Sequence, residues 1–153
     1  MAADGETAGE PLFLDTSLIV AATVEAHPSH GPACAFIDKA VGDGLEMCVS
    51  LQVCREFLVV LTRQPVSERV FELGEALAAL DVWTTGCRVL EENHAVLREW
   101  LDLVRQYGVR GKQVHDCNIV ATMRANGVQR LATRNAADFK RYATLIRVDA
   151  VVD

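Results

Sequence analysis

The chain has 153 residues, half of them hydrophobic, and a formal net charge of −6. This length suits one hydrophobic core and is short for two, so we expect a single domain over residues 11–153. Residues 1–10 are acidic, rich in small side chains and without an apolar stretch, so we expect a flexible tail there and not a signal peptide. No apolar run is long enough to cross a bilayer, which argues against a membrane protein and predicts a soluble, cytoplasmic one.

The charge is divided unevenly along the sequence. Residues 105–153 carry nine basic and four acidic side chains, a net charge of +5, whereas residues 1–104 carry −11. Such a division predicts one face for a polyanion such as a nucleic acid and another face for a basic partner. A solvated surface with no role in binding is the alternative interpretation.

The cysteines are odd in number, widely spaced and mostly set among apolar neighbours: Cys34, Cys48, Cys54, Cys87 and Cys117. This pattern predicts buried free thiols in a reducing compartment and not a disulfide framework. None forms a Cys-x-x-Cys pair or has zinc-site spacing with a histidine, so we do not expect structural zinc.

Short apolar runs alternate with helical patterns along the chain. The runs predict strands at 12–14, 47–49, 82–84, 130–133 and 145–148. Apolar spacing, with Ser50 and Ser67 as N-caps, predicts helices at 17–22, 28–41, 51–63, 67–80, 88–107 and 112–126. Gly108 and Gly127 are the predicted ends of the last two helices. The alternation predicts an α/β fold in which right-handed crossovers bring mostly parallel strands into one sheet.

The first predicted strand ends in a carboxylate followed by two hydroxyls, at Asp15, Thr16 and Ser17. At the carboxyl edge of a parallel sheet, side chains point into the crevice where ligands bind. Asp15 is therefore a candidate functional residue. The alternative is that Asp15 serves only as the N-cap of the following helix.

Three further acidic residues, Glu56, Asp116 and Asp138, can reach the same edge if the sheet is parallel. Clustered carboxylates repel one another unless cations neutralise them, and oxygen ligands suit Mg²⁺ or Mn²⁺. Such an ion activates a water and stabilises negative charge on a phosphodiester. Singly, each acid has a structural explanation: Glu56 in a surface pair with Arg55 or Arg63, Asp116 in a helix first turn, and Asp138 as an N-cap.

Four segments, in this order, resemble the motifs of a PIN domain, and more narrowly those of VapC-type toxins of bacterial toxin–antitoxin systems. They are Leu14-Asp15-Thr16-Ser17, Arg55-Glu56-Phe57, His115-Asp116-Cys117-Asn118-Ile119-Val120-Ala121 and Thr133-Arg134-Asn135-Ala136-Ala137-Asp138-Phe139. The resemblance runs from about Pro11 to Val148. It implies a single PIN-like domain with a parallel sheet of about five strands flanked by helices.

The resemblance also implies a Mg²⁺- or Mn²⁺-dependent endoribonuclease, restrained by a cognate antitoxin and frequently a homodimer. Asp15, Glu56 and Asp116 match the three acidic metal-site positions. For the fourth, family members place an acid either where this chain has Asn135 or where it has Asp138, and we favour Asp138. The supporting polar groups are then Ser17, Thr133 and Asn135, and the basic second half becomes an RNA-contact surface with Arg110, Lys112, Arg134, Lys140 and Arg141.

Other functions have weaker support in the sequence. A phosphatase of the haloacid-dehalogenase kind also begins with an Asp after a strand, but needs a second Asp where this chain has Ser17. A PIN nuclease of RNA processing without an antitoxin, and a PIN-like module that binds RNA or protein without cleaving, remain open alternatives.

Several residues that suggest other chemistry have simpler explanations. His115 is expected to pack or to orient a neighbour, and Cys117 points too far from it to form a nucleophilic pair. Trp83 and Trp100 are expected in the core. The glycines near 108–112 lack the spacing of a P-loop.

Overall fold

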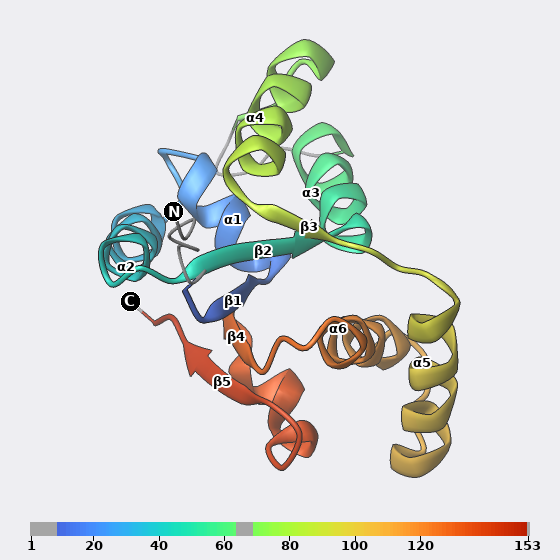
Figure 1. Ribbon diagram of the computed structural model, residues 1–153. Coiled ribbons are helices and arrows are strands. Elements are labelled where there is room, and N and C mark those ends of the chain that lie inside the picture. Colours follow the sequence, from blue (N-terminus) through green and yellow to red (C-terminus); the bar gives the residue numbers. More distant parts are fainter. Residues whose placement is uncertain (1–8, 64–68, 153) are drawn as a thin grey trace, which may run out of the picture.

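The structure, a computed structural model, describes residues 9–63 and 69–152. Five parallel strands form one sheet in the order β3-β2-β1-β4-β5 (Figure 1), which confirms the predicted fold class. The strands are β1 (Pro11–Leu14), β2 (Glu46–Ser50), β3 (Arg88–Leu90), β4 (Arg130–Thr133) and β5 (Arg147–Ala150). The helices are α1 (Thr16–Thr23), α2 (His30–Gly42), α3 (Leu51–Arg63), α4 (Leu73–Gly86), α5 (His94–Tyr107), α6 (Gln113–Ala125) and the 3₁₀ helix η1 (Ala136–Tyr142).

The helices form two groups on either side of the sheet (Figure 1). Helix α1 contacts α2 and α3, α3 contacts α4, and α6 contacts both α5 and η1. From β1 the chain moves outward to β2 and β3, then returns across the sheet to β4 and β5. The helices that follow the neighbouring strands β1 and β4 therefore leave in opposite directions. In parallel sheets, such a switch point leaves a crevice at the carboxyl ends of the two strands.

The sequence places the core at the centre of this sheet. Leu12, Phe13 and Leu14 of β1 are fully buried, because β1 has strands on both sides and helices on both faces. A strand covered on both faces has a continuous apolar run and not an alternating one, as seen here. Phe57 and Leu61 of α3 pack into the same core, as their helical spacing predicts.

Two predicted helix boundaries are set by the capping groups that the sequence indicates. The Ser50 hydroxyl accepts a hydrogen bond from the Val53 N–H at 3.4 Å, and α3 starts at Leu51 as predicted. Gly108 ends α5 in the left-handed conformation with φ of 60°, which glycine adopts without steric cost. These local signals fix the ends of α3 and α5 independently of the packing.

The predicted strand at 82–84 is wrong. Those residues lie within α4, which continues to Gly86, and the third strand is β3, at Arg88–Leu90. The long helix predicted from residue 88 is consequently too long at its start. α5 begins at His94, where the Asn93 side chain accepts hydrogen bonds from the N–H groups of Ala95 and Val96. A short apolar run does not distinguish strand from helix by periodicity, and Val82, 70% exposed, contributes nothing to a core.

Other boundaries differ by a few residues. The second helix begins at His30 and not at Pro28, and the last strand lies two residues later than predicted, at Arg147–Ala150. The predicted cap Ser67 lies outside the described residues, and α4 begins at Leu73. Most of the predicted tail, residues 1–10, also lies outside them. Within the described ranges, no helix is both long and apolar enough to cross a bilayer.

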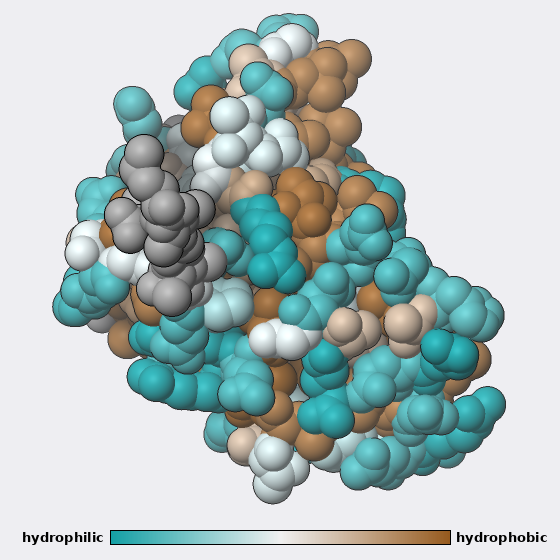
Figure 2. Space-filling model, viewed as in Figure 1, coloured by the Kyte–Doolittle hydropathy of each residue, from teal (hydrophilic) through white to brown (hydrophobic). Residues whose placement is uncertain are grey.

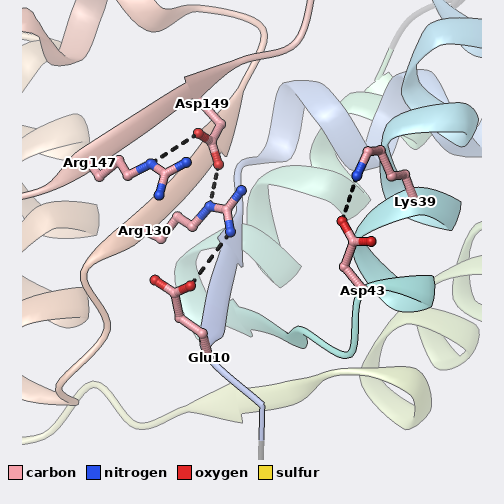
Figure 3. Close-up of polar contacts among 6 residues, drawn as sticks. All are labelled: Glu10, Lys39, Asp43, Arg130, Arg147 and Asp149. Carbon is pink, nitrogen blue, oxygen red and sulfur yellow. Dashed lines mark hydrogen bonds and ion pairs between the residues drawn. The ribbon is translucent and has the colours of Figure 1, made fainter.

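A cluster of ion pairs joins β1, β4 and β5 away from the carboxyl edge (Figure 3). Arg130, at the start of β4, reaches Asp149 of β5 and also Glu10 ahead of β1, and Arg147 contacts the same Asp149. Figure 3 also shows the exposed pair Lys39–Asp43 on α2. Arg105 and Arg124 pair with other acids. Part of the positive charge of the second half is thus balanced by acids of the same chain.

Candidate active site

Asp15 follows β1 directly, at the switch point of the sheet. Its backbone N–H donates to the Ala132 carbonyl of β4 at 3.0 Å, which holds it against the neighbouring strand. Its side chain accepts from the Thr16 N–H at 2.8 Å, so the predicted N-cap role is confirmed. Asp15 is only 7% exposed, and burial raises the pKa of its carboxyl, although hydrogen bonds from Thr133 and Thr16 oppose the rise.

Hydroxyl groups from both strand ends bind the carboxylate of Asp15. The Thr133 hydroxyl, at the end of β4, donates to Oδ2 at 2.6 Å, and the Ser17 hydroxyl donates to the same oxygen at 3.3 Å. Thr133 accepts in turn from the Asn135 N–H at 3.0 Å, and Ser17 accepts from the Arg134 N–H at 3.3 Å. Ser17 and Thr133 thus contact Asp15 directly, whereas Asn135 is linked to it only through its backbone N–H, which donates to Thr133.

Glu56 lies on α3 beside the same edge. Its Oε2 accepts a hydrogen bond from the Thr16 hydroxyl, and its Oε1 accepts one from the Gln52 side-chain amide, both at 2.7 Å. Thr16 therefore links Glu56 to Asp15, because the Thr16 backbone binds one acid and its hydroxyl the other. Glu56 is half-buried, and Thr16 and Gln52 bind both oxygens of its carboxylate. It therefore differs from the surface ion-pair residue of the alternative interpretation.

Asp116 lies in the first turn of α6, on the opposite side of the sheet from α3. Its pKa is raised to about 6, first by burial and then by the charges of Asp15, Asp138 and Glu56, with a small opposing effect of His115. The other three predicted acids thus lie close enough to Asp116 for their charges to raise its pKa. Asp138, exposed on η1, is the outermost of the four acids.

The sequence reading missed a polar network behind Glu56. Gln52 donates its side-chain amide to Glu56 and to the His115 carbonyl at 3.0 Å, and it accepts from the Asn118 amide at 2.7 Å. The Glu92 carboxylate accepts from the Asn118 amide at 2.8 Å and from the Gln52 backbone N–H at 2.6 Å. The network joins α3, α6 and the loop before α5. The spacing of Gln52 and Glu56, one helical turn apart, was the sequence feature that indicated their contact. Glu92 was not identified because the helix predicted at 88–107 included it, whereas α5 begins at His94.

Gln52→Leu is expected to lower the free energy of unfolding by about 1–3 kcal/mol, because it leaves partly buried partners of the amide without hydrogen bonds. Urea denaturation followed by circular dichroism measures this loss. Gln106→Leu, on the exposed surface of α5, is the matched control and should leave the stability nearly unchanged. Equal midpoints for the two variants would show that the network does not stabilise the fold.

The donor chemistry of the four acids suits a hard divalent cation, since all candidate ligands are carboxylate oxygens. Burial, and after it the charges of the neighbouring carboxylates, raise the pKa of Asp116, and a bound cation would offset those charges. In residues 9–63 and 69–152, however, no three His, Cys, Asp or Glu side chains are grouped as a ready-made metal site. The structure therefore identifies candidate ligand residues and not a coordination geometry.

The cysteines and tryptophans, which could have suggested other chemistry, have structural roles in the fold. Cys117 is buried and burial raises the pKa of its thiol, which keeps it protonated and unlike a nucleophile. All five cysteines are free, but only Cys48 and Cys117 are buried as predicted, and the other three are half-buried. Trp83 and Trp100 pack partly buried against the core, and their indole N–H groups donate to the Thr23 hydroxyl and the Val114 carbonyl, both at 2.9 Å.

The candidate RNA contacts differ in how they are held. Arg110 and Lys112 are exposed just before α6, which carries Asp116. Lys140 and Arg141 are exposed on η1, the element that carries Asp138. Arg134 is half-buried, and its guanidinium donates to the buried Ser29 hydroxyl. Contact between any of these side chains and RNA stays a prediction.

Comparison with known proteins places this arrangement in a family. Residues 12–145 match the PIN domain family. The chain is 28% identical to Ribonuclease VapC24 of Mycobacterium tuberculosis over 129 residues, which are 84% of this chain and 88% of that protein.

Solved structures with the same fold come from several bacteria. The structure of VapBC2 from Rickettsia felis bound to a promoter DNA fragment contains a chain that aligns with a TM-score of 0.68 at 18% identity, covering 92% of this chain and 98% of that one. VapC20 of Mycobacterium tuberculosis, described as a sarcin-ricin loop cleaving toxin, aligns with a TM-score of 0.58 at 23% identity, covering 87% and 94%. The chain belongs to the PIN domain family.

Proposed function

We propose that this protein is a Mg²⁺- or Mn²⁺-dependent endoribonuclease and the toxin of a toxin–antitoxin pair. The observation that carries the proposal is that Asp15, Glu56 and Asp138 lie near Asp116 at the switch point, where burial and then their charges raise the pKa of Asp116 to about 6. The 28% identity with a protein named a ribonuclease supports RNA as the substrate. The four acids and the RNA substrate belong to one mechanism, because phosphodiester cleavage produces negative charge that a cation must offset.

Asp15, Glu56, Asp116 and Asp138 are the residues that would hold the cation. When bound, a divalent ion lowers the pKa of a water and stabilises negative charge on the phosphate, so no nucleophilic side chain is needed. Thr133, Thr16 and Ser17 fix the orientation of Asp15, and Gln52 fixes Glu56. Two of the four oxygen donors, Asp15 and Glu56, are therefore held in position by both strand ends and by α3.

The partner in this proposal is a cognate antitoxin that presents a basic side chain, preferably arginine, to the carboxylates. Several fold neighbours were solved in VapB–VapC complexes, which supports such a partner. A homodimer acting in the cytoplasm is part of the same proposal. The phosphatase alternative has lost its support, because the chain belongs to the PIN family.

The proposal is tested by incubating the chain, purified free of any partner, with structured RNA in Mg²⁺, Mn²⁺ or EDTA. We expect cleavage with either metal and none in EDTA, and gel electrophoresis with end-labelled RNA measures it. Addition of the product of the adjacent gene should suppress the cleavage. Intact RNA under all metal conditions would favour the non-cleaving binding module, and cleavage that no neighbouring gene product suppresses would favour an RNA-processing nuclease.

A further inference from the structure

A pocket opens near Glu56, between α3, α5, α6 and the loop that precedes α5. Its volume is about 410 Å³, within the range of small-molecule sites. Arg55 and His115, the residues immediately before Glu56 and Asp116, form part of its lining. Gln52, which donates to Glu56 at 2.7 Å, also lines the pocket, so the pocket lies next to one of the four acids.

We propose that this pocket binds one unstacked nucleobase of the RNA, next to the phosphate that is cleaved. The inference rests on the proposed function in taking RNA as the ligand, and it adds a site that selects the substrate. Single-stranded bases are bound in proteins by an apolar surface against the ring and polar groups against its edge. Both kinds of surface are present here.

The apolar wall consists of Val96, Leu97, Trp100 and Val114. The Trp100 indole is fixed by its hydrogen bond to the Val114 carbonyl at 2.9 Å, so α5 and α6 hold the wall between them. Leu97 is 45% exposed although it lies within this wall. A base covering Leu97 and the accessible part of Trp100 would remove apolar surface from water, which favours binding.

The polar wall consists of Glu92, Asn93 and Asn118. Glu92 is held by its hydrogen bonds to the Gln52 N–H and the Asn118 amide, so its carboxylate is already oriented. A fixed carboxylate accepts from the amino groups of bases and repels phosphate. The wall thus favours a base inside the pocket. The sugar-phosphate backbone is then left at the rim, where the exposed guanidinium of Arg55 can meet it.

Leu97→Glu tests the pocket, with Leu101→Glu as the matched control. Leu101 lies one turn further along α5, is 37% exposed and is outside the pocket lining. Both variants add the same charge to the same helix. We expect Leu97→Glu to raise KM for a short single-stranded RNA by about tenfold, the order of one base stacked on a protein surface, with little change in kcat. Leu101→Glu should leave both close to wild type.

An abasic scan of the RNA supplies the second arm. In the wild type, one abasic nucleotide near the cleaved bond should raise KM by a similar factor, and in Leu97→Glu the same nucleotide should have no further effect. Binding of fluorescently labelled RNA in EDTA, measured by anisotropy, repeats both comparisons without cleavage. Cleavage with a flat abasic scan, or equal effects of the two variants, would overturn the pocket and leave the nuclease intact. Leu97-dependent binding without any cleavage would instead support the pocket and refute the nuclease.

Discussion

Asp116→Asn is expected to lower the rate of RNA cleavage by about 100-fold or more, because it removes a charged ligand from a site that stabilises the transition state by several kcal/mol. Asparagine keeps the size of the side chain and one of its oxygens. The loss would therefore report the charge of residue 116 and not its shape. Cleavage rates at saturating Mg²⁺, with end-labelled RNA, measure the effect.

The same substitution should leave the metal-free fold at least as stable at pH 7 as the wild type. Burial and three neighbouring carboxylates disfavour the charged form of Asp116, and the neutral amide removes that repulsion. Asp81→Asn, on the exposed surface of α4, is the control and should change neither activity nor stability. Full cleavage by Asp116→Asn would remove Asp116 from the catalytic machinery, and loss of both activity and stability would assign it a structural role.

Figure 2 shows an apolar area on the surface of α3 and α4, at the top of the molecule. These two helices carry exposed apolar side chains, among them Val59 of α3 and Leu73, Leu77 and Val82 of α4. Because these apolar side chains are exposed, the pattern between residues 67 and 86 predicted a strand where the structure has the end of α4. Apolar residues normally indicate the buried face of an element, so an apolar exposed face removes the contrast on which periodicity depends.

The central part of the fold could be predicted because its local signals agree with its packing. The continuous apolar run of β1, the Ser50 cap and Gly108 each indicate one conformation, and the structure contains all three as predicted. The edge strand β3 could not be predicted in the same way. It has three residues, of which only Leu90 is buried, so its identity depends on pairing with β2 and not on its own pattern.

The acids were predictable because the strand order places the end of β1 beside the end of β4, and each motif contributes a carboxylate to that edge. The hydrogen-bond partners of these acids were harder to predict from the sequence. Thr16 was read as part of the motif, but its link to Glu56, 40 residues away, arises only when α1 and α3 pack together. Glu92 and Asn118 contribute to the site through Gln52, and nothing in their spacing along the chain indicates it.

A decrease in pH should affect activity and stability in opposite directions. The pKa of Asp116 in the folded, metal-free chain is about 6, above its ordinary value of 3.8. The folded state therefore binds this proton more tightly than the unfolded state, and the contribution of Asp116 to stability increases as the pH falls from about 7 toward 4. Cleavage should fall below pH 6 by about tenfold per unit, because a protonated carboxyl no longer serves as a charged ligand.

Competition between the proton and the metal makes this pH dependence diagnostic. Raising the Mg²⁺ concentration should move the midpoint of the activity profile to lower pH, since the cation displaces the proton from the same carboxylate. In EDTA, urea midpoints at pH 5 and pH 7 should differ more for the wild type than for Asp116→Asn, which has no such proton to bind. A midpoint that does not depend on Mg²⁺ would mean that the titrating group is not a metal ligand. An equal pH dependence of stability in the two proteins would mean that Asp116 does not titrate in this range, and that the four carboxylates are coupled less strongly than their positions imply.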